Sequence, residues 1–356
     1  MKYSAIKRIL VIGDYFPDSF ADNIIITLKN MGHEVCWAPA NPFANTDKAY
    51  SRIIASYALK IFPKLESVMS AKLIDTATHF NPDLVISTQS GVAPETIAKM
   101  KNKTGAIIVC WYTDSVANLV RQYILAAPYD ALFCKDMYMV ELFRKKLNKN
   151  TFYLPEACNP LWHNTTTLNE DEEKYYGCDI SVAGNMYYYR AMILEELMEH
   201  ELKIWGPMFP RWLNSETRKA FQGRYIAKHE KAKAFIGAKI NLNTVHYTEV
   251  SGLNCRAFEI AGCGGFQIVD YKSALNELFE IGKEIVTFDT IGELKDKVAY
   301  YLEHDNERRE IAGKGYLRAH KDHTYEKRLV TVLEVVSNLS KKGLCGTESQ
   351  QVAKHG

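Results

Sequence analysis

The sequence lacks the features that mark nucleic-acid-binding, membrane-spanning and metal-binding proteins. Its formal net charge is only +2, so it has no basic excess of the kind that binds nucleic acid. No apolar run approaches the ~20 residues that span a bilayer, and residues 1–12 are too short and too charged for a signal peptide. No Asp-x-Asp follows a predicted strand, and no His/Cys cluster has metal-ligand spacing. We therefore expect no nucleic acid partner, no metal and no cofactor.

Paired cysteines are also missing. The eight cysteines include no Cys-x-x-Cys pair. Cys36, Cys110 and Cys134 lie inside apolar, strand-like runs, where reduced buried thiols are the usual state. With 47% hydrophobic and 24% charged residues, the composition is that of an ordinary globular protein. This pattern predicts a cytoplasmic protein.

Predicted strands alternate with predicted helices throughout the chain. At 356 residues it is long enough for two domains. Gly13 after the first strand is a lone glycine, which is weak support for a phosphate-binding loop there. The alternation indicates an α/β fold with parallel sheets covered on both faces. The strands expected in the first half are 8–12, 34–38, 84–87, 106–111, 131–134 and 151–154, with helices near 19–31, 53–80, 94–101, 117–126 and 137–147.

A change of character near residue 155 suggests a domain boundary. The segment 155–176 contains two prolines, three consecutive threonines and the acidic run Glu170–Glu173, which is typical of an exposed linker. We expect a first Rossmann-like domain (1–155), a linker (156–177), a second Rossmann-like domain (178–322), a terminal helix (323–342) and a disordered tail (343–356).

The stretch Asn254–Asp270 (NCRAFEIAGCGGFQIVD) predicts a short buried helix, a glycine turn and a buried strand. Arg256 and Glu259 share one face of that helix at i and i+3. Charges on so apolar a helix need partners. The spacing fits two interpretations: an ion pair between them, or Glu259 accepting ribose hydroxyls while Arg256 faces a phosphate.

The arrangement Arg-x-Phe-Glu-x-x-x-Cys-Gly-x-Phe resembles the nucleotide-sugar site of GT-B glycosyltransferases, in particular the CgeB-like (spore maturation) branch of the group-1 transferases. The resemblance implies two Rossmann-like domains facing an interdomain cleft, with a terminal helix returning to the first domain. In that family the helix glutamate holds the donor ribose, and Glu259 occupies its position. The glycine turn, which includes Gly264, lets the backbone approach the nucleotide. Ser251 stands where many retaining relatives carry a second glutamate, so the stereochemical outcome stays open.

Gly184 and Asn185 resemble the phosphate-facing turn of the same family. They follow a predicted strand (178–183) and precede a helix, whose N-terminal N–H groups attract a diphosphate. Arg190 lies in the first turns of that helix and would add charge to the same oxygens. The alternative is an ordinary β–α turn with a surface arginine.

Two more stretches belong to the expected donor site. Trp205 and Gly206 end the predicted strand 202–205, where open α/β sheets bind ligands, and relatives have the nucleotide base beside this edge. A tight turn that needs glycine is the alternative. Asn243 leads into the motif and would line one wall of the donor site. His246, three residues on, would bind phosphate or support a loop.

Asp114 is the candidate catalytic base. It follows an apolar strand in the first domain, and a base for an inverting transfer must take a proton from an acceptor hydroxyl within hydrogen-bonding reach. The alternative is an N-cap for a helix over 115–126. Asp14 and Asp18, near the first strand, are weaker candidates for the same role.

The expected function is metal-independent transfer of a sugar from a UDP- or dTDP-linked donor to a hydroxyl of a glycan, glycolipid or protein. A nucleotide-sugar 2-epimerase of the same fold and a non-catalytic nucleotide-sugar-binding protein are the alternatives. A nicotinamide dehydrogenase does not fit, because the glycines after Gly262 follow a helix and precede a strand, the reverse of the dinucleotide fingerprint. The basic stretch 211–239 suggests either contact with anionic lipid head groups or, as the simpler interpretation, a solvated helix face. The sequence does not predict an oligomeric state.

Overall fold

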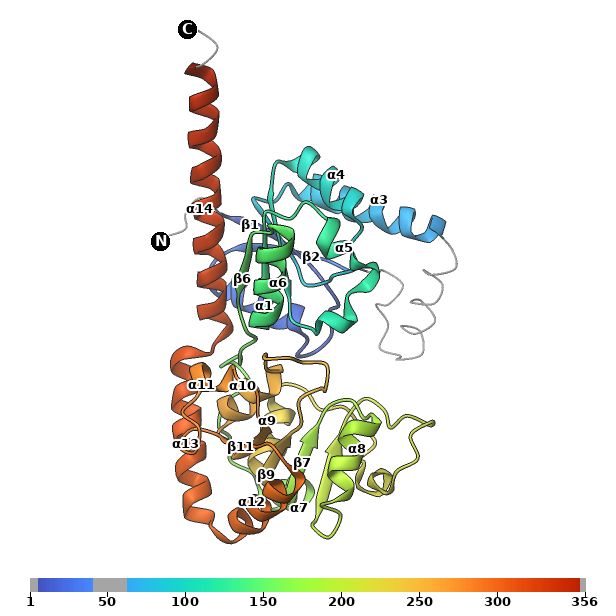
Figure 1. Ribbon diagram of the computed structural model, residues 1–356, viewed down its shortest axis with the longest axis vertical. Helices are drawn as coiled ribbons and strands as arrows, with labels where there is room; N and C mark the ends of the chain where they lie inside the picture. The colour runs from blue at the N-terminus through green and yellow to red at the C-terminus, as the bar shows by residue number, and fades with distance from the viewer. Residues whose placement is uncertain (1–5, 41–62, 353–356) are drawn as a thin grey trace. The chain divides into compact units, whose positions relative to one another are not determined.

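The computed structural model describes residues 6–40 and 63–352, and the chain divides into two compact units. Unit 1 comprises Met1–Leu154 together with Tyr325–Gly356, and unit 2 comprises Pro155–Thr324. None of the helices in the described ranges combines the length and the apolar character that a bilayer span requires. Each unit is an α/β layer structure, as the alternation of elements predicts (Figure 1).

The described part of unit 1 is built on a parallel sheet of six strands in the order β2-β1-β3-β4-β5-β6. Apolar residues run continuously through its inner strands because helices cover both faces, and β3 and β5 are buried along their whole length. The strands are β1 (Arg8–Ile12), β2 (Glu34–Ala38), β3 (Leu84–Ser87), β4 (Ile107–Tyr112), β5 (Ala131–Cys134) and β6 (Thr151–Tyr153).

Helices complete unit 1, and the last of them returns from the end of the chain. They are α1 (Phe20–Asn30), α3 (Pro63–Phe80), α4 (Pro94–Thr104), α5 (Tyr123–Ala126), α6 (Met137–Leu147) and α14 (Tyr325–Val352). Helix α14 packs against α1, and its first residue, Tyr325, lies 6.0 Å from the ring of Phe20 and 6.3 Å from that of Trp111. The terminal helix therefore belongs to the first unit, as predicted.

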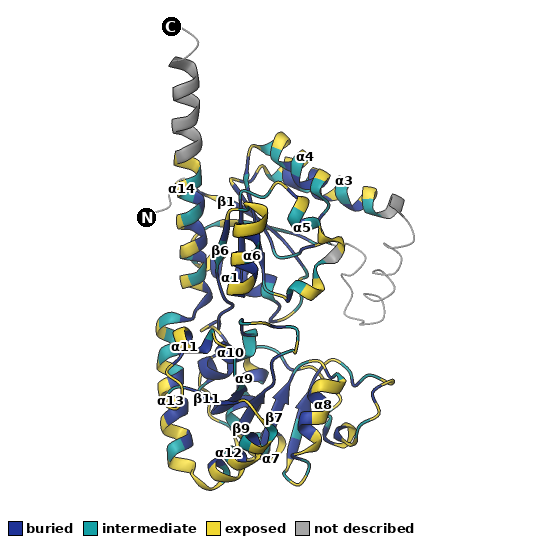
Figure 2. Ribbon diagram, viewed as in Figure 1, coloured by how far each residue is buried: buried dark blue, intermediate teal, exposed yellow. Residues whose placement is uncertain are grey.

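Unit 2 contains a parallel sheet of five strands, ordered β11-β10-β9-β7-β8 within the described residues. The strands are β7 (Cys178–Ala183), β8 (Leu202–Trp205), β9 (Ala238–Asn243), β10 (Gln267–Asp270) and β11 (Val286–Phe288). The helices are α7 (Glu170–Tyr176), α8 (Tyr188–Glu195), α9 (His229–Gly237), α10 (Cys255–Cys263), α11 (Leu275–Leu278), α12 (Ile291–Glu303) and α13 (Asp305–Asp322). Figure 2 shows that the strands of this sheet are mostly buried. Because every pair is parallel, the carboxyl ends of these strands meet at one edge of the sheet.

The segment 156–177 differs from the exposed linker that its composition suggests. It belongs to unit 2, and Cys158 and His163 within it are fully buried. The acidic run forms the first turn of α7, where negative charge is favourable at a helix N-terminus. Asn169 and Glu172 close a capping box there, so the charges begin a helix instead of marking a flexible connection.

The helix expected over 117–126 is also different in the structure. Two 3₁₀ turns, Val116–Asn118 and Val120–Gln122, precede the single turn of α5. Arg121 and Gln122 have left-handed backbones with φ of 47° and 54°, which a continuous helix does not accept. An ion pair of 2.6 Å between Arg121 Nη1 and Glu66 Oε2 accompanies this break.

The structure also bears on the expected start of α3, the expected C-terminal tail and the state of the cysteines. Helix α3 begins at Pro63, and the earlier part of the helix expected near 53–80 lies outside the described residues. Helix α14 extends to Val352, so residues 343–352 are helical where a disordered tail was expected, and 353–356 lie outside the described residues. The cysteines with described side chains are free thiols, and burial raises the pKa of Cys134 to about 12.

Candidate functional site

The polar residues of the expected donor site gather at the carboxyl edge of the unit 2 sheet. Gly184 follows β7, Gly206 follows β8 and Thr244 follows β9, and these three strands are neighbours. Helix α10 runs back from the same edge, so its first residues, including Arg256, lie there as well. Carboxyl edges of parallel sheets are where α/β proteins bind ligands.

The turns after β7 and β8 approach each other so closely that only glycine fits. A Cβ on Gly206 would lie 2.6 Å from the carbonyl oxygen of Gly184. The Gly184 N–H in turn donates to the Trp205 carbonyl at 2.8 Å, extending the ladder between the strands. Gly184 has a φ of +129°, and a Cβ there would lie 2.7 Å from Arg256 Nη1 and 3.0 Å from Arg190 Nη1. The bare backbone of Gly184 therefore lies against two guanidinium groups.

Among the described residues, Arg190 is held by neutral acceptors. Its side chain is 2% exposed, although it stands near the start of α8. Nε donates to Thr244 Oγ1 at 2.7 Å, Nη2 donates to the Thr244 carbonyl at 3.1 Å, and Nη1 donates to the Asn185 carbonyl. The guanidinium also lies 4.9 Å from the ring centre of Tyr187, a cation–π distance. The alternative of a surface arginine is therefore wrong.

Arg256 is placed by a pair of amides. Asn243 and Asn254 exchange hydrogen bonds, Nδ2 to Oδ1 in each direction, at 3.1 and 2.9 Å. The Asn243 oxygen also lies 3.4 Å from Arg256 Nε, as an acceptor. Because Asn243 is 1% exposed and ends β9, this amide pair connects the strand to the start of α10. We call Arg190 and Arg256 the arginine pair.

The arginine pair has positive charge, and the described residues provide no counterion for it. Neither guanidinium lies within 4.0 Å of a carboxylate in the part of the chain that the structure describes. Burial, followed by the charge of Arg256, lowers the pKa of Arg190 to about 9. Like charges in a site of low dielectric repel each other, and an anion between them removes that cost. The geometry is therefore that of an anion site.

Glu259 does not pair with Arg256, so the ion-pair interpretation of the motif is wrong. Its Oε1 lies 3.1 Å from Lys231 Nζ of α9 and 3.9 Å from His163 Nε2. The backbone N–H of Asn159 donates to His163 Nδ1, so the ring presents its other nitrogen, Nε2, to Glu259. The other carboxylate oxygen, Glu259 Oε2, is buried and has no hydrogen-bond partner in the described residues. That oxygen is available to a hydroxyl of a ligand.

Some predicted donor-site residues contribute backbone only. Asn185 has an exposed side chain, and its carbonyl serves Arg190. The Trp205 ring is buried in the core, and its centre lies 5.8 Å from that of Tyr175 and 5.7 Å from that of Tyr176. Among the described residues, the indole makes no contact with the arginine pair. Gly206 contributes the close turn already described.

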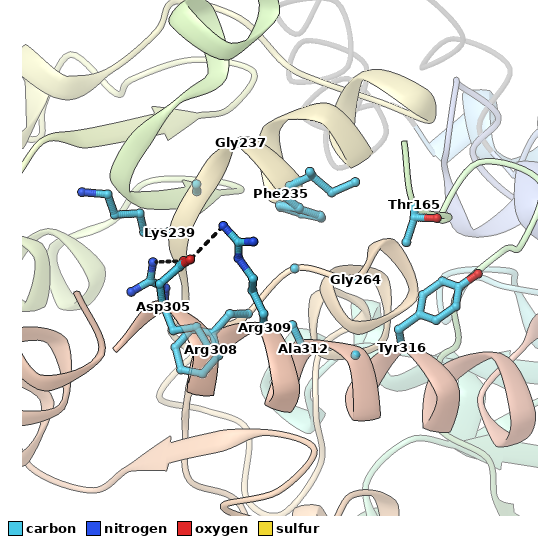
Figure 3. Close-up of a pocket in the computed structure, with 15 residues that line it drawn as sticks. Thr165, Phe235, Gly237, Lys239, Gly264, Asp305, Arg308, Arg309, Ala312 and Tyr316 are labelled. Carbon is cyan, nitrogen blue, oxygen red and sulfur yellow. Dashed lines mark hydrogen bonds and ion pairs between the residues drawn. The ribbon is translucent and has the colours of Figure 1, made fainter. Parts of the chain in front are cut away.

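Gly264 lies at the other end of α10 from Arg256. It closes the helix in a left-handed conformation with φ +77°. Since α10 rises about 1.5 Å per residue, its two ends are about 13 Å apart. Gly264 lines a separate pocket at the amino edge of the sheet, together with Lys239, Asp305 and Arg309 (Figure 3). The structure therefore does not group Gly264 with the arginine pair.

Asp114 is exposed at the end of β4 in unit 1. Its Oδ1 accepts hydrogen bonds from Ser115 N at 2.7 Å and Asn118 Nδ2 at 2.9 Å. The N-cap of the following 3₁₀ turn is Ser115, whose hydroxyl accepts from Ala117 N. Asp114 Oδ2 takes part in none of these contacts.

Sequence reasoning missed Lys231 and Asp270. Lys231 lies in the basic stretch interpreted as a solvated face, yet it is 6% exposed and pairs with Glu259. Nothing in its neighbourhood in the sequence marks it, because its partner lies 28 positions away in the chain. Asp270 is the last residue of β10, at the same edge as the arginine pair. A carboxylate at the end of a buried apolar run is the sequence feature that could have identified it as a site residue.

Two sequence matches relate this chain to known proteins. Residues 190–334 match the family model described as glycosyl transferase-like. Over 289 residues the chain is 20% identical to spore protein CgeB of Bacillus subtilis (strain 168), a match that covers 76% of this chain and 86% of the relative. These matches support the predicted resemblance to CgeB-like glycosyltransferases.

The chain is also similar in fold to solved structures. Sucrose-phosphate synthase from Thermosynechococcus elongatus aligns with a TM-score of 0.68 and 10% identity, over 94% of this chain and 100% of that one. Anabaena HepE in complex with UDP-glucose aligns with a TM-score of 0.64 and 12% identity, over 94% and 99%. The predicted GT-B fold is confirmed.

We expect Gly184→Ala to destabilise the protein by about 1–3 kcal/mol, because a side chain is strained at this φ and collides with two arginines. Urea denaturation measures the change. Gly292→Ala is the matched control: it lies in α12 with open space around the new methyl, so its stability stays equal or rises by up to about 1 kcal/mol. Equal stability of Gly184→Ala and the parent contradicts the close packing.

Proposed function

We propose that this protein transfers a sugar from a UDP- or dTDP-linked donor to a hydroxyl of a glycan, glycolipid or protein, without a metal. The anion site at the carboxyl edge of unit 2 supports a diphosphate-containing donor. HepE, a structural neighbour, was solved with UDP-glucose, which makes a uridine nucleotide the first donor to test.

The single observation that carries the proposal is the arginine pair around Gly184. A nucleotide diphosphate supplies negative charge that would balance the two guanidinium groups. The bare backbone of Gly184 lets phosphate oxygens approach. As the bond between the anomeric carbon and the phosphate oxygen breaks, negative charge grows on the leaving diphosphate. Two fixed guanidinium groups stabilise that charge where a metal ion does so in other transferases.

Glu259 is assigned to the donor ribose. A carboxylate oxygen that is buried and without a hydrogen-bond partner costs free energy until a donor reaches it. Lys231 pairs with the other carboxylate oxygen, Oε1, so Oε2 remains an acceptor for ribose hydroxyls. Arg256 lies one turn earlier on the same helix, in reach of the phosphates.

Asp114 is assigned as the general base in an inverting transfer. The acceptor hydroxyl attacks the anomeric carbon and loses its proton to a carboxylate within hydrogen-bonding reach. Asp114 is accessible, and its hydrogen bonds to Ser115 and Asn118 engage only Oδ1. Ser115 caps the following turn, so the carboxylate is not needed as the cap.

The proposed reaction is tested with a panel of UDP- and dTDP-linked sugars. We expect at least one of them to release free nucleotide diphosphate, and the rate to be unchanged by EDTA because the arginine pair supplies the positive charge. Arg256→Gln is expected to slow the release by at least about tenfold, since a charge-assisted contact to the leaving group is lost. A rate abolished by EDTA contradicts metal independence, and conversion to a 2-epimer without nucleotide release contradicts transfer.

Glu259→Gln tests the ribose assignment. The amide keeps the shape but removes the charge, so we expect affinity for nucleotide diphosphate to fall about ten- to a hundredfold, which is about 1.5–3 kcal/mol. Isothermal titration calorimetry measures the affinity. Glu293→Gln is the control, because it removes a half-buried carboxylate from α12 of the same unit, where it pairs with Lys297. Parental affinity of Glu259→Gln contradicts the assignment.

Asp114→Asn tests the base. Asparagine keeps the acceptor oxygen that holds Ser115 N and Asn118, so the turn and the stability should stay close to parental. Loss of the base predicts parental donor affinity with turnover reduced by about two or more orders of magnitude. Full turnover, or a product with retained anomeric configuration, rules out the base assignment.

A further inference from the structure

A wall of aromatic rings extends from the arginine pair along the carboxyl edge of unit 2. Tyr187 lies 4.9 Å from the Arg190 guanidinium and 4.8 Å from the ring of His246. The His246 ring stacks on Tyr247 at 4.3 Å, and Tyr247 lies 5.9 Å from Tyr189. We call Tyr187, His246, Tyr247 and Tyr189 the aromatic wall. It is accessible, since Tyr247 is 64% and Tyr189 37% exposed.

The aromatic wall ends at a carboxylate. The hydroxyl of Tyr189 donates to Asp270 Oδ2 at 3.2 Å. Asp270 is the last residue of β10, whose Val269 is in register with Asn243 of β9. Asp270 therefore stands beside Thr244, the residue that holds Arg190, at a strand separation of about 4.8 Å.

The chemistry of this end of the site differs from that of the arginine pair. A carboxylate accepts hydrogen bonds and repels phosphate, so Asp270 does not suit the diphosphate. Aromatic faces and a few placed polar groups are the usual lining of a site for a neutral ligand. Burial raises the pKa of Asp270, which indicates a carboxylate partly withdrawn from water.

We propose that Asp270, positioned by Tyr189, accepts hydrogen bonds from hydroxyl groups of the transferred sugar while the aromatic wall borders the sugar ring. The inference rests on the proposed function, because it places the sugar next to a diphosphate held by the arginine pair. In this arrangement the sugar lies between the phosphates and Asp270. Asp270 belongs to β10, the strand next to β9 along the edge.

The test compares a nucleotide with the same nucleotide carrying a sugar. Dissociation constants for UDP, dTDP and the UDP- and dTDP-linked hexoses are measured by calorimetry on the full chain, and the tightest hexose donor is taken forward. Asp270→Asn is expected to weaken that donor about ten- to a hundredfold and to leave the free nucleotide diphosphate within about twofold. Tyr189→Phe keeps the ring and removes the hydroxyl, so a smaller loss of about three- to tenfold, again for the sugar-linked donor alone, is expected.

Asp289→Asn is the matched control. Asp289 directly follows β11, the strand next to β10 at the same edge, and its change should alter neither constant. Equal weakening of nucleotide and nucleotide sugar in Asp270→Asn, no weakening of either, or the same loss in Asp289→Asn overturns the sugar assignment. A parent that binds no nucleotide at all overturns the proposed function itself. Thermal unfolding of each variant confirms that it is folded.

Discussion

The contact of two guanidinium groups with the backbone of Gly184 is the constraint on which the site in unit 2 depends. It requires a glycine at 184, because any Cβ there would lie within 3.0 Å of both arginines. It requires a second glycine at 206, whose turn presses on the Gly184 carbonyl. It also requires Thr244 and Asn243 at the end of β9 as neutral acceptors for the two arginines. Three neighbouring parallel strands thus contribute to one anion site, and none of them would form it alone.

The two charged residues of α10, Arg256 and Glu259, do not pair with each other because Glu259 pairs with Lys231. Arg256 and Glu259 are close enough on one helix face to neutralise each other. Lys231, contributed by α9, pairs with Glu259 and leaves Arg256 without an acid in the described part of the chain. Removing Lys231 would free Glu259 to approach Arg256 and cancel its charge. The buried lysine therefore preserves a positive site and a carboxylate acceptor side by side, an arrangement that the proposed nucleotide diphosphate requires.

The sequence predicted the strands better than the helices, for a physical reason. Buried parallel strands such as Ala131–Cys134 and Cys178–Ala183 are short apolar runs, and their bounds match the structure. The helix expected over 117–126 failed because an ion pair to distant Glu66 accompanies left-handed residues that local propensity does not reveal. The same limit applies to the site. Gly184, Arg190 and Arg256 were visible as strand-end and motif residues, but the partner of Glu259 depends on tertiary packing that no local spacing encodes.

The motif that organises this chain is continuous in sequence but divided in space. Helix α10 runs opposite to the strands it connects, so Arg256 and Glu259 lie toward the carboxyl edge of the sheet and Gly264 lies at the amino edge. Gly264 ends the helix, and Gly262 allows contact with Cys158, where a Cβ would lie 2.7 Å from the cysteine Cβ. The glycines therefore determine how α10 packs on its neighbours and how the chain turns from α10 into β10. Their effect on the anion site is indirect: they set the position of the helix whose first two turns carry the charged residues.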